Sequence, residues 1–142
     1  MSEASPTVPC AVCGIGIDVV EIERFAKVLA RRPSLAMRVF TDAERAEVTQ
    51  RAYPPQHLAA RFAAKEALMK ALAAGIGAFS LKEVEVVRAP GVAGPSGPPM
   101  LALHGKAAEV ADRLGVTHFH VSLTHSGPLA LAVVLAERTG AA

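Results

Sequence analysis

The order of secondary-structure patterns in this sequence predicts an α+β fold, in which a mainly antiparallel sheet packs with one long helix. An alternating segment at 13–20 comes first, and helical patterns follow at 20–32, 41–51 and 57–74. Strands that cluster after helices, rather than alternating with them, are typical of α+β architecture. The second half of the chain supplies β-rich segments and one short helix, predicted at Val84–Val87, Met100–Leu103, Lys106–Leu114, Phe119–His125 and Leu129–Ala136.

Length and composition indicate one ordinary globular domain. The chain has 142 residues, of which 51% are hydrophobic, so it can bury a real core. We expect a flexible extension at 1–12 and a single domain at 13–142. A net charge of +2 implies no bulk attraction to nucleic acid. No apolar run reaches the roughly 20 residues that span a bilayer, so we expect a cytoplasmic protein without membrane contact. Cys10 and Cys13 form a lone C-x-x-C, interpreted as incidental reduced thiols.

The first strand has two unlike faces. A period of two places branched apolar side chains on one face, and two glycines with Asp18 on the other. The apolar face comprises Ile15, Ile17 and Val19, and the bare face comprises Gly14, Gly16 and Asp18. We expect the bare face to leave room for a ligand beside the carboxylate. An alternative stays open, in which Asp18 helps to cap the helix that follows.

The helix predicted at 20–32 separates apolar from basic side chains. At about 100° per residue, the apolar stripe and the basic stripe fall on opposite sides. The apolar stripe is Ile22, Phe25 and Leu29, and the basic stripe is Arg24, Lys27 and Arg31. A basic stripe suits either a solvated face or a docking surface for an acidic partner.

Two signals bound the next short helix. Thr41 and Glu44 stand three apart, which is the spacing of a capping box. Pro54 and Pro55 are expected to stop this helix, because a proline disfavours the helical conformation in the residue before it.

The helix at 57–74 is the strongest in the chain because it is rich in alanine and leucine. Lys65 falls within its apolar stripe, where a charge must find an anionic partner or reach solvent. Glu66 and Lys70 stand four apart on the neighbouring flank. Their simplest interpretation is an i, i+4 ion pair, which leaves Lys65 unexplained. The apolar stripe comprises Leu58, Phe62, Met69 and Leu72.

The two carboxylate-bearing segments 14–18 and 61–70 suggest chemistry when taken together. Folded against each other, they would bring two hard oxygen ligands, from Asp18 and Glu66, beside basic groups. That combination suits a Mg²⁺-dependent reaction at a pyrophosphate. His125 lies where a predicted hairpin turns, a place where a lone histidine is more often structural than catalytic.

With Val121–Ser126, these segments resemble the 4′-phosphopantetheinyl transferases of the short holo-acyl-carrier-protein synthase type. The likeness runs from about Cys13 to Glu137 in family order and spacing. It implies that 4′-phosphopantetheine is transferred from coenzyme A to a serine of an acidic acyl carrier protein, releasing adenosine 3′,5′-bisphosphate, in fatty acid biosynthesis. It also implies a homotrimer with active sites between protomers.

The resemblance assigns roles to particular residues of this chain. Asp18 and Glu66 would be the Mg²⁺ ligands. The residues expected at coenzyme A are Arg61, Lys65, Lys70, His125 and Ser126. The catalytic set is Glu66, Lys70 and His125, and the carrier-protein surface is Arg24, Lys27 and Arg31.

Some alternatives remain open at this stage. The proton acceptor is either Glu66 or a water held by the metal, and the acceptor carrier could belong to a polyketide or peptide synthetase. A different class of function is a non-catalytic binder that holds an acidic protein. The chain also departs from the family pattern at Ala73, where glycine is usual, and at Pro98, where a lysine is lost.

Overall fold

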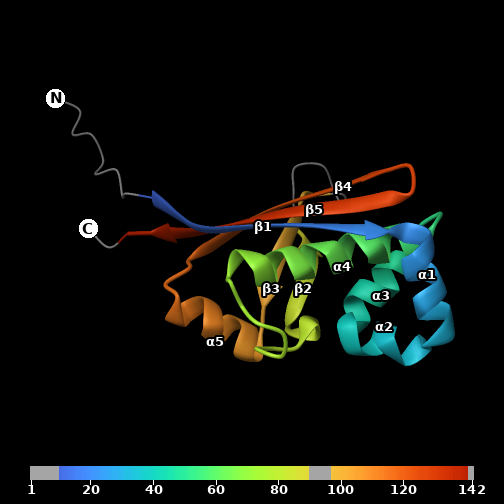
Figure 1. The fold of residues 1–142 in the computed structure, drawn as a ribbon, viewed down its shortest axis with the longest axis horizontal. Coiled ribbons are helices and arrows are strands. Elements are labelled where there is room, and N and C mark those ends of the chain that lie inside the picture. The colour runs from blue at the N-terminus through green and yellow to red at the C-terminus, as the bar shows by residue number, and fades with distance from the viewer. Residues whose placement is uncertain (1–9, 90–96, 141–142) are drawn as a thin grey trace.

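A long helix lies along a three-stranded sheet in the computed structural model, which describes residues 10–89 and 97–140 (Figure 1). The sheet has the order β1-β5-β4, and both neighbouring pairs are antiparallel. A second antiparallel sheet pairs β2 with β3. The expected α+β fold is therefore confirmed. The strands are β1 (Cys10–Glu21), β2 (Val84–Arg88), β3 (Pro99–Leu103), β4 (His118–Ser126) and β5 (Leu129–Thr139).

The helices lie on one side of the three-stranded sheet, and α4 packs directly against it (Figure 1). Figure 1 shows α1, α2 and α3 gathered at one end of α4, with α5 near its other end. None of the helices in the described ranges is long and apolar enough to cross a membrane. Their bounds are α1 (Ile22–Arg31), α2 (Pro33–Val39), α3 (Asp42–Thr49), α4 (Pro54–Ala71), α5 (Gly105–Arg113) and the 3-10 turn η1 (Leu81–Glu83).

The prolines before α4 start that helix, which corrects the expectation that they only end the preceding one. Pro54 and Pro55 occupy its first positions, where the missing N–H would have no helical partner in any case. Pro33 likewise opens α2, a helix that the sequence patterns did not predict. Prolines between helical patterns therefore mark helix starts twice in this chain.

Strand β1 begins before the predicted domain boundary. Cys10 pairs with Thr139, so three residues of the segment 1–12 belong to the sheet. The remaining residues of that segment, 1–9, lie outside the described residues. Cys13 carries an exposed free thiol in this strand.

The bare face of β1 packs against α4, so the helix fills the space at Gly14 and Gly16, whereas Asp18 on the same face lines a pocket. A Cβ atom on Gly16 would lie 1.8 Å from the carbonyl oxygen of Ala67, and one on Gly14 would lie 1.9 Å from that of Ala71. Only glycine permits such close approach of a strand to a helix backbone.

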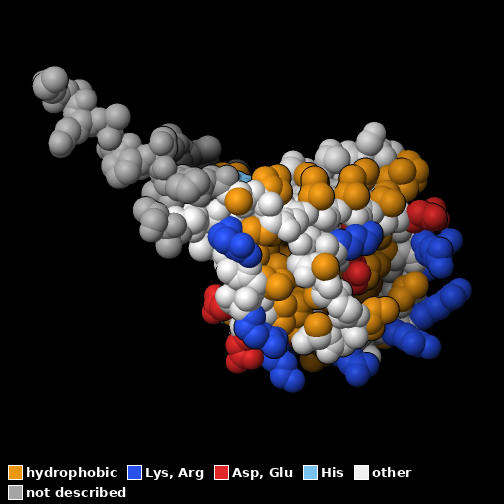
Figure 2. Space-filling model, turned by 60° about the vertical axis from the view of Figure 1, so that its left-hand side comes forward, with side chains coloured by type: hydrophobic (Ala, Val, Ile, Leu, Met, Phe, Trp, Pro, Cys, Tyr) orange, Lys and Arg blue, Asp and Glu red, His pale blue; other side chains and the backbone are white. Residues whose placement is uncertain are grey.

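The opposite face of β1 is apolar and exposed. Ile15 and Ile17 are 66% and 61% exposed. Figure 2 shows hydrophobic side chains in a row along the upper edge of the molecule, where the three-stranded sheet lies. The helix, rather than the apolar side chains of β1, therefore defines the inner face of this strand.

Alanine forms much of the contact between α4 and the sheet. Ala63, Ala64 and Ala67 are fully buried, and their small side chains let the helix approach the strands closely. A second cluster joins α4 to the first two helices through Phe25 and Phe40. This packing fixes α4, and with it the acidic and basic side chains that the helix carries.

Helix α4 ends in a strained residue. Ala73 has φ = +50°, and the N–H groups of Ala73 and Ala74 donate to the carbonyls of Lys70 and Met69. These two bonds define a Schellman motif, whose left-handed position favours glycine. The departure from the family pattern at Ala73 therefore carries a backbone cost.

Replacing Ala73 with glycine should raise the free energy of unfolding by about 1 kcal/mol, because an alanine pays a steric penalty in the left-handed region. Urea denaturation measures the change. Ala74→Gly is the matched control, since the positive φ belongs to Ala73 and not to its neighbour. A variant Ala73→Gly that unfolds at lower urea than the parent would refute this explanation.

Candidate active site

Asp18 and Glu66 come from β1 and α4 and face the same pocket. Both residues line a cavity of about 600 Å³, together with Arg24 and Phe25 of α1. Asp18 lies on the face of β1 that packs against α4, which brings the strand carboxylate to the helix. The pairing of two acids that are 48 positions apart (66 − 18) agrees with the expectation from the two sequence segments.

Lys70 binds Asp18 rather than Glu66. Its Nζ donates to Asp18 Oδ1 at 3.2 Å and to the backbone carbonyl of Ile17 at 2.9 Å. The simple i, i+4 ion pair with Glu66 is therefore not formed. The capping alternative for Asp18 is also wrong, because the N-cap of α1 is Glu21.

The negative charges of Asp18 and Glu66 lie near each other and favour the binding of a cation between them. Burial raises the pKa of Glu66, and the charge of Asp18 raises it further, whereas Lys70 opposes both effects. Two carboxylates with neighbouring room for phosphate oxygens and water fit Mg²⁺, which rarely uses an all-protein cage. Across 10–89 and 97–140 no three acidic, histidine or cysteine side chains cluster as a metal site.

Lys65 is an interior residue, and this corrects the expectation that it contacts coenzyme A. Its side chain is fully buried, and its Nζ donates to Glu44 Oε1 at 2.9 Å. It also donates to the carbonyls of Val39 at 2.7 Å and Leu81 at 3.2 Å, and it lies 5.1 Å from the centre of the Phe40 ring. The anionic partner that Lys65 needs is thus inside the protein.

Glu44 is the partner that sequence reasoning missed. Thr41 accepts the Glu44 N–H, as a capping box requires, but the Glu44 carboxylate turns into the core. There it binds Lys65 and accepts the N–H of Val86 at 3.2 Å. Burial is the largest influence on both ions, raising the pKa of Glu44 and lowering that of Lys65. The pair ties α3, α4 and β2 together.

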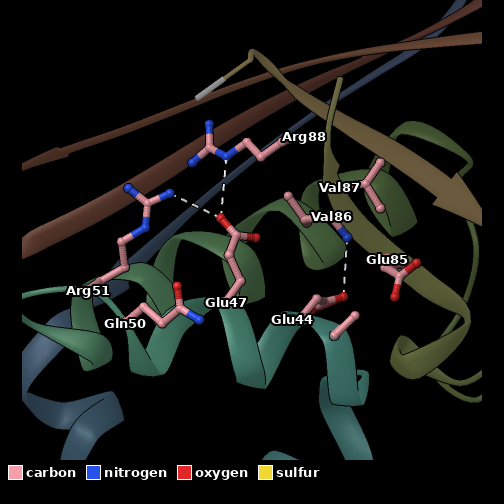
Figure 3. A pocket seen from close by; sticks show the side chains of 9 residues that line it. Glu44, Glu47, Gln50, Arg51, Glu85, Val86, Val87 and Arg88 are labelled. Carbon is pink, nitrogen blue, oxygen red and sulfur yellow. Dashed lines mark hydrogen bonds and ion pairs between the residues drawn. The ribbon is translucent and has the colours of Figure 1, made fainter. Parts of the chain in front are cut away.

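Arg61 is also almost fully buried, and it belongs to a second ionic cluster. Its Nη2 donates to Glu47 Oε2 at 2.7 Å, and Glu47 Oε1 accepts from Arg51 at 3.1 Å. Figure 3 shows the Glu47 carboxylate between the side chains of Arg51 and Arg88 in a pocket of about 550 Å³. Glu47 lines this pocket with Arg51 and Arg88, and Arg61 binds Glu47 without lining the pocket itself.

His125 and Ser126 lie away from the two acids. His125 is exposed at the end of β4, and its Nε2 lies 2.8 Å from Nε2 of Gln56 in the first turn of α4. Gln56 and Glu66 are ten residues apart on that helix, a rise of about 15 Å. A single chain therefore brings together Asp18, Glu66 and Lys70, but it does not bring His125 to them.

The basic side chains of α1 are exposed, as expected. Arg24 reaches the rim of the pocket that holds Asp18 and Glu66. Lys27 lies 3.5 Å from Glu23 in an exposed ion pair, and Arg31 lies in the last turn of the helix. Of the basic stripe, Arg24 therefore borders the pocket that holds Asp18 and Glu66.

Comparison with known proteins assigns the family. Residues 14–134 match the model of the 4′-phosphopantetheinyl transferase superfamily. A holo-[acyl-carrier-protein] synthase of Frankia alni is 47% identical over 127 residues, covering 89% of this chain and 98% of that protein.

Solved structures give the same result. The holo-[acyl-carrier-protein] synthase of Neisseria meningitidis is 29% identical with a TM-score of 0.78, covering 89% of this chain and 98% of that one. The Helicobacter pylori synthase, solved in complex with coenzyme A, is 28% identical with a TM-score of 0.72, covering 86% and 98%. The chain therefore belongs to the 4′-phosphopantetheinyl transferase superfamily, and it is a transferase.

Proposed function

We propose that this protein is a holo-acyl-carrier-protein synthase, which transfers 4′-phosphopantetheine from coenzyme A to a serine of an acyl carrier protein. The observation that carries the proposal is the shared pocket of Asp18 and Glu66, which Arg24 also lines and where Lys70 binds Asp18. Family membership and the names of the relatives support the same reaction. The second product is adenosine 3′,5′-bisphosphate.

Mg²⁺ is the metal that this acid pair fits. Asp18 and Glu66 would hold it, and the ion would neutralise charge that develops on the leaving phosphate. Lys70 stands beside Asp18 and contributes a further positive charge at the same place. Together these groups favour a site that binds a pyrophosphate.

Glu66 is our candidate for the proton acceptor among the chain's own groups. It borders the pocket where the serine hydroxyl would enter, and the alternative acceptor is a water held by the metal, because a cation bound to Glu66 would lower the basicity of its carboxylate. Lys70 would hold the phosphate that is attacked, and the carboxylate would orient the hydroxyl toward it.

A homotrimer with sites between protomers explains the position of His125 and Ser126. These residues, with Lys70, are proposed to contact coenzyme A, with His125 and Ser126 supplied by a neighbouring protomer. The exposed apolar face of β1, formed by Val12, Ile15, Ile17 and Val19, supports assembly, because monomers rarely expose such a patch. Sedimentation velocity tests it, and a monomer at micromolar concentration would argue against it.

Product analysis tests the proposed function. The protein is incubated with coenzyme A, Mg²⁺ and an apo carrier protein, and modified carrier and adenosine 3′,5′-bisphosphate should form in equal amounts. Carrier domains of polyketide and peptide synthetases, offered separately, identify the preferred acceptor. A carrier that binds but never gains mass would instead favour a non-catalytic binder.

Arg24, Lys27 and Arg31 are proposed to dock the acidic carrier. Arg24→Glu should weaken carrier binding about tenfold or more at low salt, because it reverses a charge at the pocket rim. Calorimetric titration at two salt concentrations measures the effect, which added salt should reduce. Lys106→Glu on α5 is the matched control. Equal affinity for Arg24→Glu and this control would remove α1 from the docking surface.

A further inference from the structure

Three arginines surround the single carboxylate of Glu47. Arg61 and Arg51 donate to its two oxygens, and Arg88 Nε lies 3.7 Å from Oε1. Arg61 is only 2% exposed, whereas Glu47 is 31% exposed and faces the pocket. A half-exposed acid thus occupies the centre of a partly buried basic cluster, which we call the arginine cluster (Arg51, Arg61 and Arg88).

The arginine cluster carries more positive charge than the acids beside it neutralise. Three guanidinium groups face one carboxylate, because the other two acids that line the pocket have partners elsewhere. Glu44 binds Lys65, and Glu85 accepts from Thr41 at 2.6 Å and lies 3.6 Å from His104. Within the described ranges, the Nε atoms of Arg61 and Arg88 are buried and lack a hydrogen-bond acceptor.

The pKa values of two neighbouring groups, His57 and Glu47, are shifted in the direction that nearby positive charge produces. Burial lowers the pKa of His57, and the charges of Arg51 and Arg61 lower it further. Burial alone would raise the pKa of Glu47, but its hydrogen bond and attraction to Arg61 bring the pKa below its usual value. Glu47 is therefore ionised at neutral pH and holds the guanidinium groups that an incoming anion would use.

We propose that Glu47 is an internal competitor, whose carboxylate occupies the arginine cluster and weakens the binding of a phosphate group there. Carboxylate and phosphate oxygens use the same forked donors of arginine, so one must leave before the other binds fully. The inference rests on the proposed function for the identity of the ligand, a phosphate group of coenzyme A. Glu47 would then set the affinity for that substrate.

The substitution Glu47→Gln tests this competition, because it removes the charge with little change in shape at a half-exposed position. We expect inorganic pyrophosphate, titrated without divalent metal at low salt, to bind about tenfold more tightly than to the parent protein. Glu109→Gln, which removes an exposed acid on α5, is the matched control for net charge. An affinity equal to that of the control would overturn the proposal, and so would a weaker one.

A second variant locates the effect. Adding Arg88→Gln to Glu47→Gln should cancel the gain in pyrophosphate affinity, and a gain that persists would place the anion elsewhere and refute the proposal. Coenzyme A titrated against the same variants distinguishes a coenzyme phosphate from free phosphate as the natural ligand. Pyrophosphate binding is measured without a carrier protein. The competition by Glu47 can therefore be tested even if the transfer reaction is not observed.

Discussion

Replacing Glu66 with glutamine should reduce the rate of carrier modification at least about a hundredfold while the protein stays folded. Glutamine keeps the shape of the side chain but removes one of the two carboxylates proposed to hold the metal, Asp18 and Glu66, and with it the candidate proton acceptor. The initial rate of carrier mass gain measures the loss, and thermal unfolding checks the fold. Glu109→Gln is the control. A rate within about threefold of the control would exclude Glu66 from the site.

A mixing experiment extends this prediction to the assembly. His125→Ala should also be inactive, because His125 is proposed to complete the site of a neighbouring protomer. If the two inactive proteins are unfolded together and refolded, mixed trimers should contain intact sites and regain activity. Regained activity requires Glu66 and His125 to come from different chains, whereas no recovery in trimers of proven mixed composition would contradict a shared site.

The variant Lys65→Met should lose about 3–5 kcal/mol of unfolding free energy, which is the second large effect expected. Stability is lost because the carboxylate of Glu44, which is only 1% exposed, would remain buried without the cation that neutralises it. Urea denaturation measures the loss. A double variant, Lys65→Met with Glu44→Gln, should recover most of it, because the amide carries no charge and still accepts the Val86 N–H. A single variant that loses less than about 1 kcal/mol would contradict the role of the pair.

The pH dependence of Lys65→Met gives an independent check. Burial already raises the pKa of Glu44, and removing Lys65 removes the main opposing charge. A carboxyl whose pKa is higher in the folded state binds more protons there, so it favours folding at acid pH and loses that contribution as the pH rises. The stability deficit relative to the parent should therefore shrink as the pH falls from neutrality toward 4.5.

The sequence predicted the elements well because their signals are local. Period-two alternation and the alanine-rich helix located β1 and α4, and the position of Lys65 within an apolar stripe showed that it needed an anion. Its partner could not be found this way. Glu44 carried a local capping signal that explained it adequately, and only the packing of α3 on α4 turns its carboxylate inward.

The faces of β1 show the same limit. The alternation was correct, but periodicity cannot say which face a helix covers. Gly16 can face α4 because the backbone of that helix occupies the place where a Cβ atom would otherwise be. This contact joins residues far apart in the sequence, so no local pattern indicates it. Arg61 was placed at the coenzyme by resemblance, and the structure adds Glu47 beside it, which no motif indicated.

Metal dependence of carrier modification tests the central proposal, that Asp18 and Glu66 form a divalent-metal site for transfer. The measurement is the mass of an apo carrier protein after incubation with coenzyme A and this protein, in Mg²⁺ and in excess chelator. We predict complete modification with Mg²⁺, none with chelator, and restoration when Mg²⁺ is added back. Equal modification in chelator would contradict the metal site.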